Sequence, residues 1–147
     1  MTAYPFLLAI HLFAALLFIG TVAFEVIFLA PVMQRLPADV RDAVAQRLRP
    51  RMRAVMPWVV LALFVAGLGM AWQYRDALAS PGSSAFGLLL TMKVALAFSV
   101  LTHVVIAMRL ARQQRLPAAL SRRVHISVFC HMVGIVLLAK FMFHLSW

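Results

Sequence analysis

The sequence predicts an all-α membrane protein: an antiparallel four-transmembrane-helix bundle with both termini on the outer, periplasmic side. Hydrophobic residues make up 65% of the 147 residues and charged residues only 12%, whereas soluble domains are nearer half apolar and a quarter charged. Four runs are apolar and long enough to cross a hydrocarbon core of about 30 Å as helices. The arginines are concentrated in two of the connections between these runs.

The four runs give the expected transmembrane spans, which are residues 5–29, 55–74, 86–110 and 124–145. The first run is too long for the apolar part of a signal peptide and has no basic residue before it, so we expect it to stay in the mature protein. The pattern gives no sign of a separate soluble domain. We therefore expect one transmembrane domain, residues 1–147, in the cytoplasmic (inner) membrane of a bacterium.

Two basic connections set the expected orientation in the membrane. The arginines in or beside them are Arg35, Arg41, Arg47, Arg49, Arg51, Arg53, Arg109, Arg112, Arg115, Arg122 and Arg123. The remaining connection holds only Arg75 against Asp76. Because short basic loops stay in the cytoplasm, both termini should face outward. The net charge of +10 forms no basic face interleaved with aromatic residues, so we expect no binding to nucleic acid.

The first basic connection has a pattern of its own. Val40, Val44 and Leu48 recur at every fourth position after Pro37, with charged residues between them. This spacing predicts a short amphipathic helix, which we expect to lie on the inner leaflet with its arginines facing anionic headgroups.

Histidines inside the spans are the candidates for chemistry. His11, His103 and His131 each lie two or more turns inside a span, whereas His125 and His144 lie at span ends, where water or headgroups solvate them. A polar group in hydrocarbon needs a partner, so an intramembrane ionisable residue is a functional hypothesis by default. The alternative for each is a histidine that only hydrogen-bonds to a neighbouring helix.

Helical phase divides these residues between faces. His131 shares its face with the small residues Ser127 and Gly134, whereas Lys140 lies about 180° away among bulky apolar side chains. We therefore expect His131 to face the interior of the bundle. We expect Lys140 to lie on the lipid-facing side and to extend its ammonium group to the headgroups. His103 shares its face with Ser99 in the same way.

The three histidines suit a haem b group better than they suit a zinc site or a Ser-His-Asp triad. A zinc site needs its ligands at one depth, and His11 lies far from the other two along the membrane normal. A Ser-His-Asp triad lacks its acid, because every aspartate lies in a loop or at a span end. Haem iron takes one or two imidazoles, and its macrocycle fits between helices. His103 and His131 differ in depth by roughly one turn, which makes them a candidate axial pair.

All four spans resemble those of the small HemJ-type membrane protoporphyrinogen oxidases and the related copper-resistance D (CopD) membrane domain. The stretches that carry the resemblance are "AIHLFAALLFIG", "RAVMPWVVLALFVAGLGM", "MKVALAFSVLTHVVIAMR" and "LLAKFMF". Their matching residues are His11, Gly20, Pro57, Gly67, Lys93, His103 and Lys140. The resemblance implies haem b as the cofactor, porphyrin oxidation as the chemistry, and functional roles for His11 and Lys93.

The chain departs from this group in two places. It has "TVAFEVIFLAPV", with Glu25, where the oxidases have an aromatic and basic stretch, and "HISVFCHM" replaces their asparagine-glutamate-valine-proline motif. The resemblance therefore implies the scaffold and a haem site more than the oxidase reaction. Glu25 lies about 40° from His11 on one helical face. It completes the candidate cofactor-binding set of His11, Glu25, Lys93, His103 and His131.

The expected function is that of an integral membrane haem-b-binding redox protein, for electron transfer or porphyrin handling, with oxidoreductase activity as a hypothesis. The expected metal ligands are among His11, His103 and His131. The expected partners are the lipid bilayer, a membrane redox protein or quinone, and a second copy of the chain. Two alternatives stay open. One is copper handling, which the nine methionines favour, and the other is a non-catalytic subunit of a larger membrane complex.

Overall fold

The computed structural model describes residues 3–113, 115 and 117–144, and every regular element within them is a helix. Four helical stretches of the described chain are long and apolar enough to cross a membrane, as predicted: Ala3–Arg35, Ala38–Ala79, Ala85–Arg112 and Ala119–Phe141. Many of their large apolar side chains are exposed, and among the described residues no polar or charged one is buried. This distribution suits helices surrounded by lipid. The helices form two compact units, Met1–Trp72 and Gln73–Trp147.

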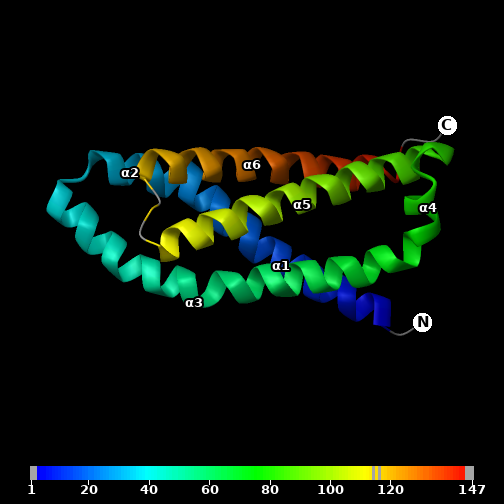
Figure 1. Ribbon diagram of the computed structural model, residues 1–147, viewed down its shortest axis with the longest axis horizontal. Helices are drawn as coiled ribbons and strands as arrows, with labels where there is room; N and C mark the ends of the chain where they lie inside the picture. Colours follow the sequence, from blue (N-terminus) through cyan, green and yellow to red (C-terminus); the bar gives the residue numbers. More distant parts are fainter. Residues whose placement is uncertain (1–2, 114, 116, 145–147) are drawn as a thin grey trace. The chain divides into compact units, whose positions relative to one another are not determined.

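The first unit begins with three helical segments that follow one another without a break: α1 (Ala3–Phe24), the π-helical turn η1 (Glu25–Leu29) and α2 (Ala30–Arg35) (Figure 1). Pro31 accounts for the π-helical turn, because it has no N–H for the Ile27 carbonyl and its ring would press on that oxygen. The Ala30 N–H instead donates to the Glu25 carbonyl five residues back. This wider turn lets the helix continue past residue 29, the expected end of the span.

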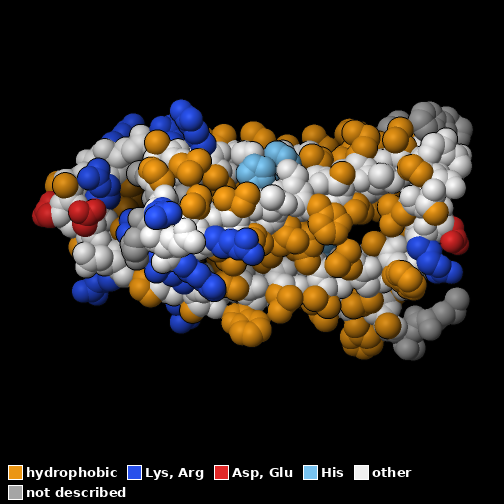
Figure 2. Space-filling view, viewed as in Figure 1, with side chains coloured by type: hydrophobic (Ala, Val, Ile, Leu, Met, Phe, Trp, Pro, Cys, Tyr) orange, Lys and Arg blue, Asp and Glu red, His pale blue; other side chains and the backbone are white. Residues whose placement is uncertain are grey.

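After a short bend, α3 (Ala38–Ala71) runs for 34 residues, with Pro50 and Pro57 inside it. The amphipathic segment and the second span are therefore one continuous helix, so our prediction of a short helix is wrong, while its place at the inner leaflet stays a prediction. At 1.5 Å per residue α3 is about 51 Å long, well beyond the hydrocarbon thickness of about 30 Å. Its N-terminal part, around which Lys and Arg side chains gather (Figure 2), must extend outside the hydrocarbon.

The long helices of the first unit pack in opposite directions. Leu7 lies against Gly69 and His11 lies against Gly67, so residue numbers rise along α1 as they fall along α3. The buried residues of these two helices are Ala14, Phe18, Val22, Val59, Val60 and Ala66. Apart from Phe18, these side chains are small or medium in size, which lets the helices approach closely, as is usual for helix pairs in membranes.

The second unit consists of two short segments followed by two long helices: α4 (Arg75–Ala79), the 3₁₀ turn η3 (Pro81–Ser83), α5 (Ala85–Arg112) and α6 (Ala118–Phe141). α5 agrees with the expected third span, whereas α6 begins before residue 124 and ends before residue 145, the expected bounds of the fourth. Phe86 contacts Tyr74 on one side and Phe143 on the other, at ring-centroid distances of 5.3 and 5.9 Å.

Gly87 occupies a crowded turn at the start of α5. The Ser84 hydroxyl caps the helix by accepting a hydrogen bond from the Gly87 N–H at 3.0 Å. A Cβ on Gly87 would lie 3.0 Å from the carbonyl oxygen of Ala77 and 3.3 Å from that of Pro81. Both are backbone atoms, so relief of the contact requires the turn to shift.

We expect Gly87→Ala to lower the free energy of unfolding by about 1–3 kcal/mol, the usual cost of overpacking. Gly82→Ala is the matched control, because a Cβ there meets nothing within 4 Å. Thermal unfolding of the detergent-solubilised chain measures the difference between the two variants. Equal Tm values for Gly87→Ala and Gly82→Ala would contradict this account of the turn.

Candidate functional site

His11 lies against α3, where it makes a hydrogen bond and a close contact. Its Nδ1 lies 3.0 Å from the Leu63 carbonyl oxygen. Because a carbonyl can only accept, Nδ1 carries the proton and donates it, and in the neutral ring the lone pair is on Nε2. The imidazole lies directly over Gly67, where a Cβ would approach its Cε1 to 3.1 Å. The glycine therefore makes the space that the ring occupies.

This arrangement is the one in which metal-ligating histidines are usually held. A ligating imidazole typically donates its other ring N–H to a carboxylate, a carbonyl or water, which fixes both the tautomer and the direction of the ring. His11 has such a donor bond, made to the backbone of a neighbouring helix. The side chain is thus oriented by the α1–α3 pair itself.

His103 of α5 and His131 of α6 form a reciprocal arrangement with two serines. Each histidine donates Nδ1–H to a carbonyl in its own helix, His103 to Ser99 and His131 to Ser127, both at 2.7 Å. Each Nε2 then accepts from the serine hydroxyl of the other helix. The Ser99–His131 distance is 3.1 Å and the Ser127–His103 distance is 3.4 Å. The ring centroids lie 5.5 Å apart.

The sequence explains this arrangement through a repeated pattern. α5 contains "SVLTH" at residues 99–103 and α6 contains "SVFCH" at residues 127–131. Residues four apart lie on one face of a helix, so each serine lies beside its own histidine, as predicted. The helices are antiparallel, so each histidine meets the serine of the other pattern. The reciprocal pairing was not predicted, although the repetition of the pattern was its signal.

The two faces of α6 are as predicted. His131 is half-buried and Met132 beside it is buried, whereas Val136, Leu137 and Lys140 are exposed. Lys140 therefore lies on the outer surface of its helix, away from the pair of histidines. At the end of the described chain, His144 is exposed and donates Nδ1–H to the Lys140 carbonyl at 2.9 Å, which agrees with an interfacial position.

Glu25 and Lys93, the other predicted site residues, are half-buried but lie far from the histidines of their own units. By helix rise, Glu25 is roughly 21 Å from His11 along the first helix, and Lys93 is roughly 15 Å from His103 along α5. The structure therefore brings neither residue to a histidine within its unit. Among the residues that the structure describes, no three His, Cys, Asp or Glu side chains group to hold a metal ion.

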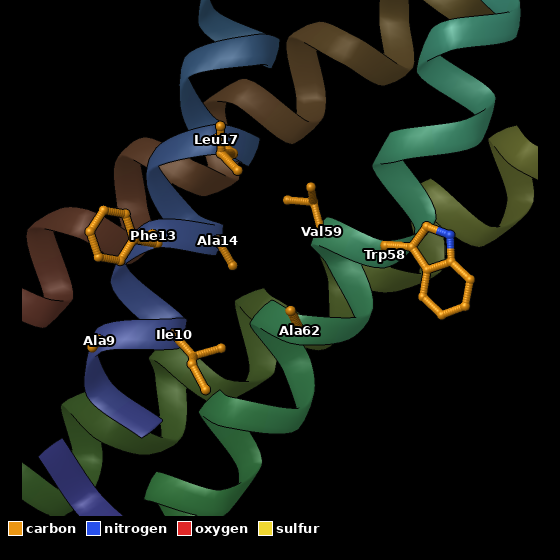
Figure 3. Close-up of a pocket in the computed structure, with 8 residues that line it drawn as sticks. All are labelled: Ala9, Ile10, Phe13, Ala14, Leu17, Trp58, Val59 and Ala62. Carbon is orange, nitrogen blue, oxygen red and sulfur yellow. The ribbon is translucent and has the colours of Figure 1, made fainter. Parts of the chain in front are cut away.

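A groove of about 440 Å³ lies between α1 and α3 (Figure 3). The residues that line it are Ala9, Ile10, Phe13, Ala14, Leu17, Trp58, Val59 and Ala62, all apolar but for the indole N–H. Ala14, Val59 and Ala62 face the space between the helices, while Phe13 and Trp58 lie at opposite edges (Figure 3). The groove can receive an apolar chain, but it offers no acid, base or nucleophile.

Comparison with protein-family models, with curated proteins and with solved structures found no match for this chain. The resemblance to HemJ-type and CopD proteins therefore stays a prediction.

Proposed function

We propose that this chain is an integral membrane protein that binds haem b through His11 and serves a redox function, either electron transfer or porphyrin handling. The observation that carries the proposal is the Nδ1–H bond from His11 to the Leu63 carbonyl, with the ring seated over Gly67. It presents a neutral imidazole whose lone pair is on Nε2, as a haem-iron ligand requires. The HemJ/CopD resemblance supports the same residue. When bound, the haem would supply one-electron chemistry.

The His103–His131 pair suits a haem less well. Val100 of α5 and Val128 of α6 are buried beside them, so the helices are in contact at this depth. A macrocycle between the two rings would require α5 and α6 to separate. We therefore place the proposed iron ligand at His11.

Lys93 lies in the second unit, and the HemJ/CopD resemblance implies a functional role for it, which stays a prediction. Glu25 lies in the inner half and is not assigned to the iron. The electron partner would be a membrane redox protein or a quinone.

The absorbance spectrum of the purified chain tests the proposal. We expect a Soret band and sharp bands in the reduced state, as haem b gives. Stoichiometric copper without these bands would favour copper handling instead. Absence of both cofactors would contradict the proposal and leave the third alternative, a subunit of a larger membrane complex, to be tested.

We further propose that both termini of the chain face the periplasm, with the arginine-rich part of α3 in the cytoplasm. In a Cys130→Ser background, Ser83→Cys should react with a membrane-impermeant thiol reagent in sealed cells, because Ser83 is exposed in η3. Gln46→Cys, exposed on α3, should react only after permeabilisation. Reaction of Gln46→Cys in sealed cells would show that the orientation is the opposite of the one proposed.

A further inference from the structure

The groove between α1 and α3 is open to its surroundings. The large side chains at its edges are more than half exposed, at 70% for Phe13, 56% for Leu17 and 71% for Trp58. Its volume of about 440 Å³ lies within the roughly 300–1,000 Å³ that is usual for small-molecule sites. Lipid tails are as apolar as the groove, so an apolar chain alone has little preference for it over the bilayer. A specific ligand therefore also needs a polar group that contacts the protein at one end.

Trp58 lies at the end of the groove that is nearest to a headgroup layer. The apolar run of α3 begins at residue 55, so Trp58 lies roughly 5 Å inside it by helix rise. An exposed indole at that depth is typical of the membrane interface, where the ring meets hydrocarbon and the N–H meets water or a headgroup. Because α1 and α3 are antiparallel, the groove runs from Trp58 and Leu17 toward Ala9, away from this headgroup layer.

Arg51 places a cation just outside this end of the groove. It is exposed and precedes Trp58 by seven residues, or two turns, so the two residues share a face of α3. By helix rise Arg51 lies roughly 6 Å outside the apolar run, within a headgroup layer that is about 5–8 Å thick. Its planar guanidinium can donate two parallel N–H bonds to a phosphate. We propose that the α1–α3 pair binds one anionic phospholipid, with its phosphate at Arg51 and an acyl chain in the groove.

The charge around Arg51 favours an anionic lipid over a zwitterionic one. Residues 35–53 contain six arginines and two aspartates, and Lys and Arg side chains gather over this part of the molecule (Figure 2). A zwitterionic headgroup carries a cation of its own, which these arginines repel. A neutral isoprenoid chain would fill the groove but has no group for Arg51 to bind. The site is separate from the proposed iron ligand, because His11 does not line the groove.

Quenching of Trp58 fluorescence by brominated lipids tests the proposal. The full-length chain with Trp72→Phe and Trp147→Phe is reconstituted in phosphatidylcholine bilayers that contain a fixed fraction of brominated phosphatidylglycerol or of brominated phosphatidylcholine. Each lipid is compared with its unbrominated form, so a bound haem affects both measurements equally. We expect phosphatidylglycerol to bind beside Trp58 at least about five-fold more tightly, the effect of one basic residue near an anionic surface. Equal quenching by the two brominated lipids would overturn the proposal.

A pair of arginine variants in the same single-tryptophan chain separates a specific site from general attraction to a basic surface. Arg51→Gln should lower the preference for phosphatidylglycerol about five-fold. Arg49→Gln removes the same charge from an exposed position on nearly the opposite side of α3, so it should leave the preference unchanged. An equal loss in both variants would mean that the lipid is attracted by net charge alone, and it would overturn the site at Arg51.

A second pair of variants tests whether the acyl chain occupies the groove. Ala62→Phe places a ring in the groove and should reduce the quenching of Trp58 by brominated phosphatidylglycerol. Leu61→Phe is the control, because Leu61 is exposed and does not line the groove, and it should quench like the unsubstituted residue. Ala62→Leu serves if Ala62→Phe does not fold. Undiminished quenching in the variant that fills the groove would contradict the proposed place of the acyl chain.

Discussion

His11→Ala is expected to abolish the absorbance bands of haem b while the chain still inserts and folds. The substitution removes the Nε2 lone pair that we assign to the iron. It also removes the bond to Leu63, whose net value is about 0.5–1.5 kcal/mol. The Leu63 carbonyl is not left without a donor, because within α3 it also accepts from the backbone N–H of Gly67. His11→Ala should therefore lose its haem, while its free energy of unfolding falls by only about 0.5–1.5 kcal/mol.

The control for this prediction is His144→Ala, which should keep the bands, because His144 is exposed and lies just after the end of α6. Chemical rescue separates loss of a ligand from loss of the fold: free imidazole added to His11→Gly should restore part of the Soret band. An unchanged spectrum in His11→Ala would mean that another residue ligates the iron, and it would contradict the assignment to His11.

Hydropathy predicted the spans well where the helix and the hydrocarbon end together. α5 is such a case, because the Ser84 cap begins the helix directly at the edge of the apolar run. In the first unit the helices continue through polar sequence, as far as Arg35 in α2 and from Ala38 in α3. Water and headgroups allow helix outside the hydrocarbon, so apolar length marks the membrane core and not the helix ends.

In the candidate site, some features depend on the phase of a single helix, and others depend on the register between two helices. The orientation of His131 away from Lys140 follows from the phase of α6 alone, and it was predicted. The contact of His11 with Gly67 depends on the register of α1 against α3, which no periodicity within either helix specifies. The hydrogen bond between Ser99 and His131 likewise depends on the register of α5 against α6. Only the repetition of one pattern on two antiparallel helices could have indicated it.

Gly67→Val is expected to weaken haem binding by about 10- to 100-fold, the usual cost of losing a partner that orients a metal ligand. A Cβ at this position would lie 3.1 Å from Cε1 and 3.2 Å from Nδ1 of His11, and the methyl groups of valine would extend further into the ring. The imidazole must then turn away from Leu63 and lose its Nδ1–H bond. The overpacking should also lower stability by about 1–3 kcal/mol.

Gly20→Val is the matched control on the partner helix, because a Cβ on Gly20 meets nothing within 4 Å. It makes the same chemical change in a long apolar helix, so the two variants differ in the contact with His11 and not in helix propensity. Gly67→Ala should fall between them, since relief of its single Cβ needs the ring to move by only a few tenths of an ångström. Haem titration and Tm would be measured on all three.

Equal haem affinity in Gly67→Val and Gly20→Val would show that the seating of His11 over Gly67 has no part in cofactor binding. A lower Tm in Gly67→Val alone would still confirm the contact between the helices, because overpacking acts whether or not haem is bound.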